Sequence, residues 1–486
     1  MMGNPTGQAK NLLVIISDEH RRDTMGCMGH PIVRTPHLDQ LAASGTVFDN
    51  AYTPSPICVP TRAALATGQY IHRTGHWDSA APYAGSPDSW MHAVRETGAD
   101  VVSIGKLHFR SAEDDNGFTR EILPMHVVGG VGWTIGLLRD DPPPYDVAAE
   151  LAADVGPGES EYTHYDRAIT KAACDWLADR KSSDKPWASF VSFINPHYPL
   201  TAPEEYWQLY KADEMDLPVA HQPEQRPTHP ELAHLLSFWD YDRYFEIERI
   251  RQAKAAYYGL VSFMDDCVGQ VLSALDQSGH RDETLIVYVS DHGDMMGDHG
   301  FWTKSVMYEA SAGIPMIISG PGVAPGRRTD VGASLIDIAP TAAGIFGISQ
   351  FAQDLPGQPL TALASEPEDT DRTVFSEYHD GGSSTGFYMV RWGDWKYIYY
   401  AGMPPQLFNL AVDPDELNDL GQSDSNAAIA ARAEGEQRLR DICEPDAVNA
   451  EAFADQRRRI DEFGGREACA TIKFNHTPAP KTASAS

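Results

Sequence analysis

The residues of this chain best suited to chemistry form one short run, Cys58-Val59-Pro60-Thr61-Arg62. The run fits C-x-P-[ST]-R, a pattern that is typical of a cysteine oxidised to the aldehyde formylglycine. Pro60 predicts the start of a helix, whose first backbone N–H groups attract an anion. Arg62 follows one turn later, where a guanidinium could hold an oxyanion through paired hydrogen bonds. The run therefore predicts a modified nucleophile beside an anion site, and it favours hydrolysis of a sulfate ester.

The elements that must position this run are indicated by mostly continuous apolar segments, which predict strands at 11–17, 100–104, 187–194 and 284–290. Such segments are typical of parallel strands that are covered by helices on both faces. Helical patterns lie between them, at 35–43, 61–67, 165–181 and 247–277. The sequence therefore predicts an α/β fold, a three-layer αβα sandwich with a mostly parallel central sheet.

Polar motifs follow each of these predicted strands at its carboxyl end. They are Asp18-Glu19-His20, Lys106-Leu107-His108, His197 and Asp291-His292-Gly293-Asp294, in chain order. Ligands of open α/β sheets gather outside the carboxyl ends of the strands. We therefore expect these side chains to converge at one edge of the sheet.

The character of the chain changes near residue 371. Strand-like runs at 374–378, 386–391 and 395–400 precede a helical pattern at 426–443. We expect a catalytic α/β domain over 1–370, followed by a small C-terminal α+β subdomain over 371–445. Residues 446–486 would form a tail with a charged helical stretch and a Pro/Ala/Ser-rich end, which we interpret as an oligomer contact.

Composition and charge restrict the class of protein further. The 486 residues include 42% hydrophobic and 10% aromatic residues, which is a globular composition. A formal net charge of −31 disfavours nucleic acid and anionic membrane surfaces as partners, although a local group of cations and a metal would still hold a small anion. The apolar runs are too short to cross a bilayer, and the first ten residues lack a signal-peptide pattern. The six cysteines form no framework, so we expect reduced thiols in a cytoplasmic protein.

On these motifs the chain resembles the type I sulfatases of the alkaline phosphatase superfamily, and among them the choline sulfatases. The resemblance spans nearly the whole chain and also includes Thr35-Pro36-His37-Leu38-Asp39, Gly105-Lys106-Leu107-His108, Pro196-His197, Phe301-Trp302-Thr303-Lys304 and Gln406-Leu407-Phe408-Asn409-Leu410. It implies hydrolysis of a small-molecule sulfate monoester, either a choline-sulfate-like or an aryl sulfate substrate. It also implies that a formylglycine-generating maturation enzyme oxidises Cys58. One hydroxyl of the hydrated aldehyde then attacks sulfur, and the sulfated intermediate collapses to regenerate the aldehyde.

The resemblance further implies a site for one divalent metal ion. Asp18, Asp291 and His292 are the expected protein ligands, joined by an oxygen of modified Cys58. Ca²⁺ is the first expectation, while the imidazole makes Mn²⁺ more plausible than in an all-oxygen site, and Mg²⁺ is a further alternative. Whether Glu19 also binds the metal stays open.

Other side chains are expected to surround the sulfate group. Lys106 and Lys304 match the family lysines that hold sulfate oxygens and stabilise the leaving oxygen. His108 matches a base for collapse of the intermediate, and His197 a general acid at the leaving oxygen. Together with Cys58 and Arg62, these residues form the predicted catalytic set.

Two alternatives stay open at this point. A phosphonate monoester or phosphodiester hydrolase of the same superfamily would share Cys58 and the metal pair, but such enzymes usually carry neutral hydroxyl residues in place of Lys106 and His108. A metal- and anion-binding protein without turnover would result if Cys58 were never modified. Whether the enzyme hydrolyses sulfate esters or phosphonate and phosphate esters, we expect it to form a homo-oligomer, either a dimer or a tetramer.

Overall fold

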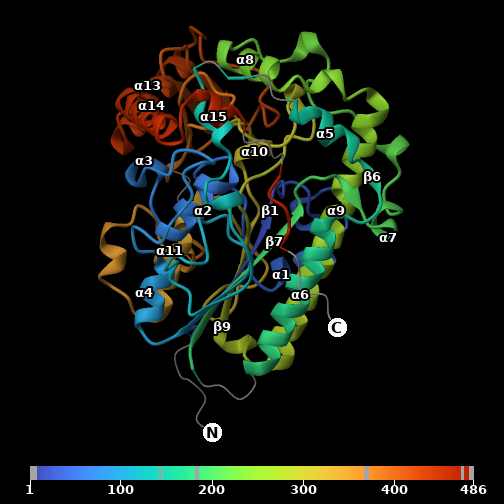
Figure 1. Cartoon of the computed structure of the whole chain (residues 1–486), viewed down its shortest axis with the longest axis vertical. Coiled ribbons are helices and arrows are strands. Elements are labelled where there is room, and N and C mark those ends of the chain that lie inside the picture. The colour runs from blue at the N-terminus through green and yellow to red at the C-terminus, as the bar shows by residue number, and fades with distance from the viewer. Residues whose placement is uncertain are drawn as a thin grey trace.

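The computed structural model describes residues 8–140, 142–143, 146–180, 185–365, 371–471 and 476–480 (Figure 1). Its main sheet contains β1 (Asn11–Asp18), β2 (Thr46–Phe48), β4 (Asp100–Lys106), β5 (Arg120–Met125), β7 (Trp187–Pro196), β9 (Thr284–Ser290), β10 (Met316–Ser319) and β11 (Arg327–Thr329). The strand order is β11-β2-β10-β9-β1-β7-β4-β5. Strands β9, β1, β7, β4 and β5 are parallel to their neighbours in this series, and β10 is antiparallel to both β9 and β2. The sheet is therefore mostly parallel, as predicted.

The strands β1, β4, β7 and β9 confirm the four strands that the apolar runs predict. Each begins at the predicted residue, but the first three continue past the predicted end. The reason is that polar residues at their carboxyl ends still pair with neighbouring strands: Gly105 of β4 pairs with Ser192, and Lys106 pairs with Met125. The strand pairing shifts register just before Asp18 and just before Lys106, so these two side chains follow local irregularities of the sheet.

Helices cover both faces of the sheet (Figure 1). The helices α1 (Pro36–Ala43), α6 (Glu161–Asp179) and α9 (Ile247–Ser278) share one core cluster with Leu13 and Ile15 of β1. The helices α2 (Cys58–Thr67), α4 (Trp90–Glu96) and α11 (Ile338–Phe346) share another with Leu12, Val14 and Ile16. Successive strand residues point to opposite faces, so β1 supplies both cores. This arrangement confirms the αβα sandwich.

Two of the predicted helices begin earlier than their patterns indicate. Helix α6 starts at Glu161 because Ser160 and Thr163 form a capping box, in which each side chain accepts a hydrogen bond from the other residue's backbone N–H. Helix α2 starts at Cys58 itself, after Ile57 in an extended conformation. Cys58 is therefore the first residue of the helix. The predicted carboxyl end of α6, at residue 181, lies outside the described residues.

The C-terminal part contains a second, antiparallel sheet. It consists of β13 (Val374–Tyr378), β14 (Phe387–Trp392), β15 (Trp395–Tyr400) and β16 (Gln406–Asn409). Helix α13 (Asn426–Ile442) packs on it so closely that a Cβ at Gly435 would lie 2.6 Å from the Tyr397 side chain. This bears out the small α+β part of the predicted fold. The boundary predicted at 370 lies outside the described residues, so the domain limits stay a prediction.

The predicted tail begins with α14 (Pro445–Glu462) and α15 (Arg466–Thr471). Both helices contact earlier parts of the same chain. Gln456 Nε2 of α14 donates to Asp78 Oδ2 at 2.9 Å, and Thr134 Oγ1 donates to the backbone oxygen of Cys469 at 2.9 Å. An oligomer contact through the tail stays a prediction.

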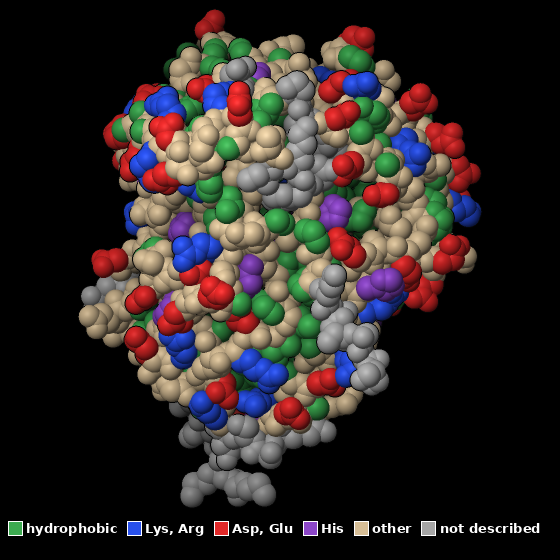
Figure 2. Space-filling model, viewed as in Figure 1, with side chains coloured by type: hydrophobic (Ala, Val, Ile, Leu, Met, Phe, Trp, Pro, Cys, Tyr) green, Lys and Arg blue, Asp and Glu red, His purple; other side chains and the backbone are tan. Residues whose placement is uncertain are grey.

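The surface carries charge of both signs. On the face that Figure 2 shows, Lys and Arg side chains stand singly or in small groups among Asp and Glu side chains. Among the described helices, none combines the length and the apolar character needed to cross a membrane.

Candidate active site

Four side chains meet at the carboxyl edge of the main sheet. Asp18 ends β1, Asp291 and His292 follow β9, and Cys58 begins α2. One ligand atom from each lies within 4.8 Å of the others, and all four residues are buried. The structure therefore brings together the metal cluster expected from the sequence.

The thiol of Cys58 lies against this cluster. Its Sγ is 3.1 Å from His292 Nε2 and 3.6 Å from Asp18 Oδ1. Burial, together with the charge of Asp18, raises the pKa of the thiol to about 12. An unmodified thiol in this position stays protonated at neutral pH and is a poor nucleophile.

The tautomer of His292 suits a metal ligand. Its Nδ1 lies 3.0 Å from the backbone oxygen of Gly293, and a carbonyl oxygen can only accept, so Nδ1 carries the proton. The lone pair of Nε2 then faces Asp291 Oδ1 at 3.7 Å and Asp18 Oδ1 at 4.0 Å. A carbonyl that fixes the ring in this way is typical of histidines that bind metal ions.

Arg62 bridges the two carboxylates of the cluster. Its Nε donates to Asp291 Oδ2 and its Nη2 to Asp18 Oδ2, each at 2.9 Å. Its Nη1 donates to Ser192 Oγ and to the backbone oxygen of Lys106, each at 3.0 Å. The guanidinium is thus occupied by protein atoms, whereas the sequence suggested that it would hold an oxyanion. In this structure Arg62 orients the carboxylates of Asp18 and Asp291.

Lys106 forms the second ion pair of Asp18. Its Nζ lies 2.5 Å from Asp18 Oδ2, at the end of β4. Burial alone would raise the pKa of Asp18, but Lys106 and Arg62 hold this pKa well below its usual range. Asp18 is therefore an anion, the form that binds a cation.

Lys304, Glu19 and His197 form a second buried group. Glu19 Oε2 lies 3.3 Å from Lys304 Nζ and 3.4 Å from His197 Nε2. Burial raises the pKa of Glu19 to about 8. Asp18, Glu19 and His197 also satisfy the spacing of a metal group, so Glu19 stays a candidate ligand.

The two predicted catalytic histidines are both neutral in this environment. Burial, and then the charge of Lys304, lowers the pKa of His197 well below its usual range, and burial with Lys106 does the same for His108. His197 Nδ1 lies 2.7 Å from the backbone oxygen of Tyr198, so its Nε2 is an acceptor. Both ring nitrogens of His108 are buried and lack a hydrogen-bond partner among the described residues. His108 is thus placed as a base, whereas an acid role requires His197 to take up a proton first.

A cavity of about 120 Å³ opens above Cys58. Cys58, Lys106, His108, His197 and Lys304 all line it, whereas Arg62 does not. Five of the six predicted catalytic residues therefore share one cavity.

Aromatic side chains form much of the wall of this cavity. They are Trp133, Tyr162, Tyr198, Trp239 and Tyr241, and no Asp or Glu lines the cavity among the described residues. Trp133 stacks on Trp239 with ring centroids 6.3 Å apart. The sequence motifs do not bring these rings together in one wall, and the position of Tyr198 directly after His197 is the signal that was available for one of them.

The C-terminal segment supplies another part of the wall. His476 and Thr477 line the cavity. Tyr162 Oη donates to the backbone oxygen of Thr477 at 2.7 Å, and His476 Nε2 lies 3.0 Å from Glu161 Oε1. Residues far apart in sequence therefore meet at the active-site cavity within one chain.

Comparison with known proteins decides the family. The family model described as Sulfatase matches residues 10–348, well over half of the chain, and a model described as N-sulphoglucosamine sulphohydrolase, C-terminal, matches residues 297–443. The chain belongs to the sulfatase family. This sulfatase is 32% identical to choline-sulfatase of Rhizobium meliloti (strain 1021) over 433 residues, which cover 85% of this chain and 82% of the relative. It is 30% identical to arylsulfatase K of Danio rerio over 436 residues, 84% of this chain and 80% of the relative.

Among solved structures, the sulfatase is similar to a phosphonate monoester hydrolase of Agrobacterium radiobacter. The TM-score is 0.72 at 25% identity, covering 91% of this chain and 96% of the other. The family assignment confirms the resemblance, the αβα fold and the enzyme class: the protein is a sulfuric ester hydrolase that acts on sulfate monoesters. The phosphonate hydrolase alternative has the weaker support, because the curated relatives with higher identity are sulfatases.

Proposed function

We propose that Cys58, after oxidation to formylglycine by a maturation enzyme, supplies the nucleophile of this sulfatase. The observation that carries the proposal is the position of Cys58 at the floor of the cavity and within reach of Asp18 and His292. With its pKa raised to about 12, the unmodified thiol would provide almost no thiolate at neutral pH. The hydrated aldehyde supplies a hydroxyl nucleophile instead.

We assign Asp18, Cys58, Asp291 and His292 to one divalent metal ion. The fit is supported by the close spacing of the ligand atoms and by the lone pair of His292 Nε2, which points into the cluster with Cys58 Sγ as its neighbour. When bound, such an ion lowers the pKa of a hydroxyl group and offsets charge on sulfate oxygens. The carboxylates favour Ca²⁺ and the imidazole keeps Mn²⁺ in consideration, with Mg²⁺ as the further alternative.

We assign separate roles around the sulfate group to the remaining side chains. Lys106 and Lys304 stand where negative charge develops on the sulfate and the leaving oxygen. His108, neutral and without a protein partner, accepts the proton when the intermediate collapses. His197 serves the leaving oxygen after taking up a proton, and Arg62 keeps the metal carboxylates in place.

The aromatic wall favours an aryl sulfate or a similar apolar ester as substrate. Trp133, Trp239 and Tyr241 offer flat apolar surface for a ring. A choline-like leaving group would also find aromatic faces, but among the described residues it would find no carboxylate for its quaternary ammonium. The relatives named choline-sulfatase and arylsulfatase K are consistent with both substrate types.

Further features of the enzyme belong to the same proposal. All six cysteines are free, which supports a reducing, cytoplasmic location. The domain limits of 1–370, 371–445 and 446–486 and a dimeric or tetrameric assembly are supported by the sequence pattern alone.

The test compares kcat/KM for an aryl sulfate with that for an aryl phosphonate monoester. The enzyme is produced together with a formylglycine-generating enzyme, and Cys58→Ala is the blank. We expect the sulfate to be preferred by orders of magnitude and the peptide that contains Cys58 to show the mass of the aldehyde. A higher kcat/KM for the phosphonate would overturn the substrate assignment. An unmodified Cys58 thiol in fully active protein would overturn the assignment of formylglycine as the nucleophile.

A further inference from the structure

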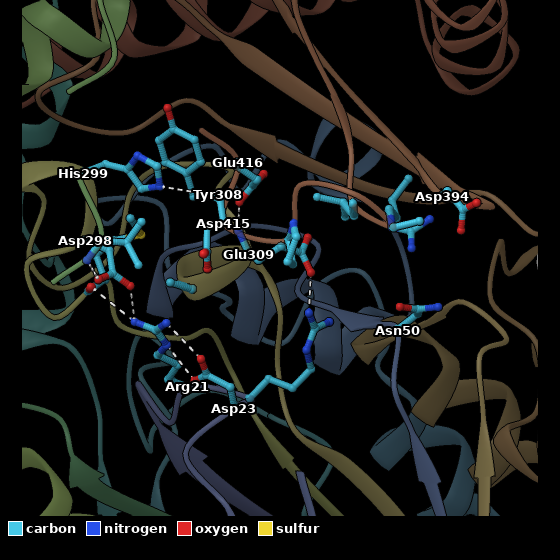
Figure 3. Close-up of a pocket in the computed structure, with 18 of the residues that line it drawn as sticks. Arg21, Asp23, Asn50, Asp298, His299, Tyr308, Glu309, Asp394, Asp415 and Glu416 are labelled. Atoms are coloured by element: carbon cyan, nitrogen blue, oxygen red, sulfur yellow. Dashed lines mark hydrogen bonds and ion pairs between the residues drawn. The ribbon is translucent and has the colours of Figure 1, made fainter. Parts of the chain in front are cut away.

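A second and larger cavity, of about 550 Å³, lies outside the active site (Figure 3). The loop after β1, the start of α10 (Glu309–Ala312), the end of β14 and the loop after β16 form its wall. None of its lining residues lines the cavity above Cys58. A ligand in this cavity would therefore not compete directly with the substrate.

Two of the arginines in this wall are paired. Arg21 Nη1 lies 2.6 Å from Asp298 Oδ2, and Figure 3 shows its guanidinium between Asp298 and Asp23. Arg22 pairs with Glu309, whose other oxygen, Oε1, lies 2.7 Å from Nζ of Lys396. These charges are compensated within the protein.

Arg391, the third arginine of the wall, is not compensated in this way. Arg391 is only 7% exposed, and its Nε is buried without a hydrogen-bond partner. Among the described residues, its guanidinium makes no ion pair and no hydrogen bond. The positive charge of Arg391 contributes to lowering the pKa of Glu309. The Glu309 carboxylate, however, already forms ion pairs with Arg22 and Lys396. Burying the Nε donor without a partner is unfavourable, so an anion that reaches the guanidinium from the cavity would complete the site.

We propose that this cavity is a second ligand site, in which Arg391 binds the oxyanion group of a small organic molecule. A guanidinium forms paired hydrogen bonds with carboxylate, sulfonate and sulfate ester groups alike. The exposed carboxylates of Asp330, Asp394 and Asp415 also line the cavity, and they oppose a dianion more strongly than a monoanion. The charge pattern therefore selects a singly charged group, and the volume leaves room for the organic part. This site goes beyond the hydrolysis proposed above and uses none of its residues.

The test is isothermal titration calorimetry of the full chain with benzenesulfonate, a monoanion that the enzyme cannot hydrolyse, at fixed ionic strength. Wild type and Arg391→Gln are compared, with Arg120→Gln, an exposed arginine of β5, as the charge-matched control. Lys304→Ala removes a cation of the active site and so identifies any ligand bound there.

We expect Arg391→Gln to lose one bound equivalent, or at least tenfold in its affinity, while kcat/KM for an aryl sulfate stays within twofold of wild type. Arg120→Gln and Lys304→Ala should both keep the equivalent that depends on Arg391. Inorganic sulfate should bind this site at least tenfold more weakly than benzenesulfonate. Unchanged stoichiometry and affinity in Arg391→Gln would overturn the proposal and leave a water-filled cavity. Should that variant fail to fold, Arg391→Lys, which keeps the charge but not the paired geometry, must still bind the sulfonate at least tenfold more weakly.

Discussion

Replacing Arg62 by methionine tests whether this residue holds the carboxylates of the metal cluster. The change removes its hydrogen bonds to Asp18, Asp291, Ser192 and the backbone oxygen of Lys106. Removing one partner of a buried ion pair costs about 3–5 kcal/mol. Lys106 Nζ remains 2.5 Å from Asp18, so only Asp291 loses its charged partner entirely. We therefore expect a loss of about 4 kcal/mol in the free energy of unfolding, the cost of one broken pair.

The assay is urea unfolding in excess chelator, because a bound cation would replace the charge of the missing guanidinium. Ser192→Ala is the matched control, since it removes a single hydrogen bond from the same guanidinium and should cost about 1 kcal/mol. Adding Ca²⁺ or Mn²⁺ should reduce the difference in the free energy of unfolding between Arg62→Met and wild type. If Arg62→Met without metal lies within about 1 kcal/mol of Ser192→Ala, the bridging role assigned to Arg62 is wrong.

Three further results are expected. Lys304→Ala should lower kcat for an aryl sulfate by about 10²–10³-fold in single-turnover assays, because it removes a charge where the leaving oxygen becomes negative, and an unchanged kcat would exclude that role. Burial opposes ionisation of Glu377, but His72 and His379 lower its pKa to about 2, so Glu377→Gln should cost about 3 kcal/mol near pH 7. Because the folded-state pKa is the lower one, that contribution is present above the unfolded value of about 4.3 and disappears as the pH falls toward 2; a difference in urea unfolding that stays constant from pH 7 to pH 3 would contradict the assignment. Trp133→Ala should raise KM for an aryl sulfate about tenfold through loss of roughly 1.4 kcal/mol of ring contact, with little change for a small alkyl sulfate, whereas equal effects on both esters would place the ring elsewhere.

The central strands were predictable because continuous apolar runs identify strands that are buried on both faces. Strands β2, β10 and β11 were not, since segments of three or four residues carry too little periodicity to be recognised. Their places in the sheet depend on pairing with distant strands, and β10 also reverses the direction of the sheet next to β9. The short strands thus depend on tertiary contacts that a local pattern does not contain.

The convergence of the active site could be predicted from the strand ends, but the direction of individual side chains could not. Arg62 lies on the predicted helix, yet only the packing of α2 against the sheet shows that its guanidinium reaches Asp18 and Asp291. The aromatic wall comes from separate loops, and Trp133 meets Trp239 only in the folded chain. Trp302 lies two residues before Lys304, yet it does not line the cavity and stacks on Phe245, with ring centroids 4.1 Å apart.

The contact between Tyr162 and Thr477 has a practical consequence for producing this enzyme. Because His476 and Thr477 form part of the active-site wall, an affinity tag or fusion partner joined after them would extend from a segment that lines the active-site cavity. The amino end offers a better attachment point, since β1 enters the sheet at Asn11 and delivers Asp18 to the site only at its far end. Activities measured with a C-terminal tag would therefore report on the tag as well as on the enzyme.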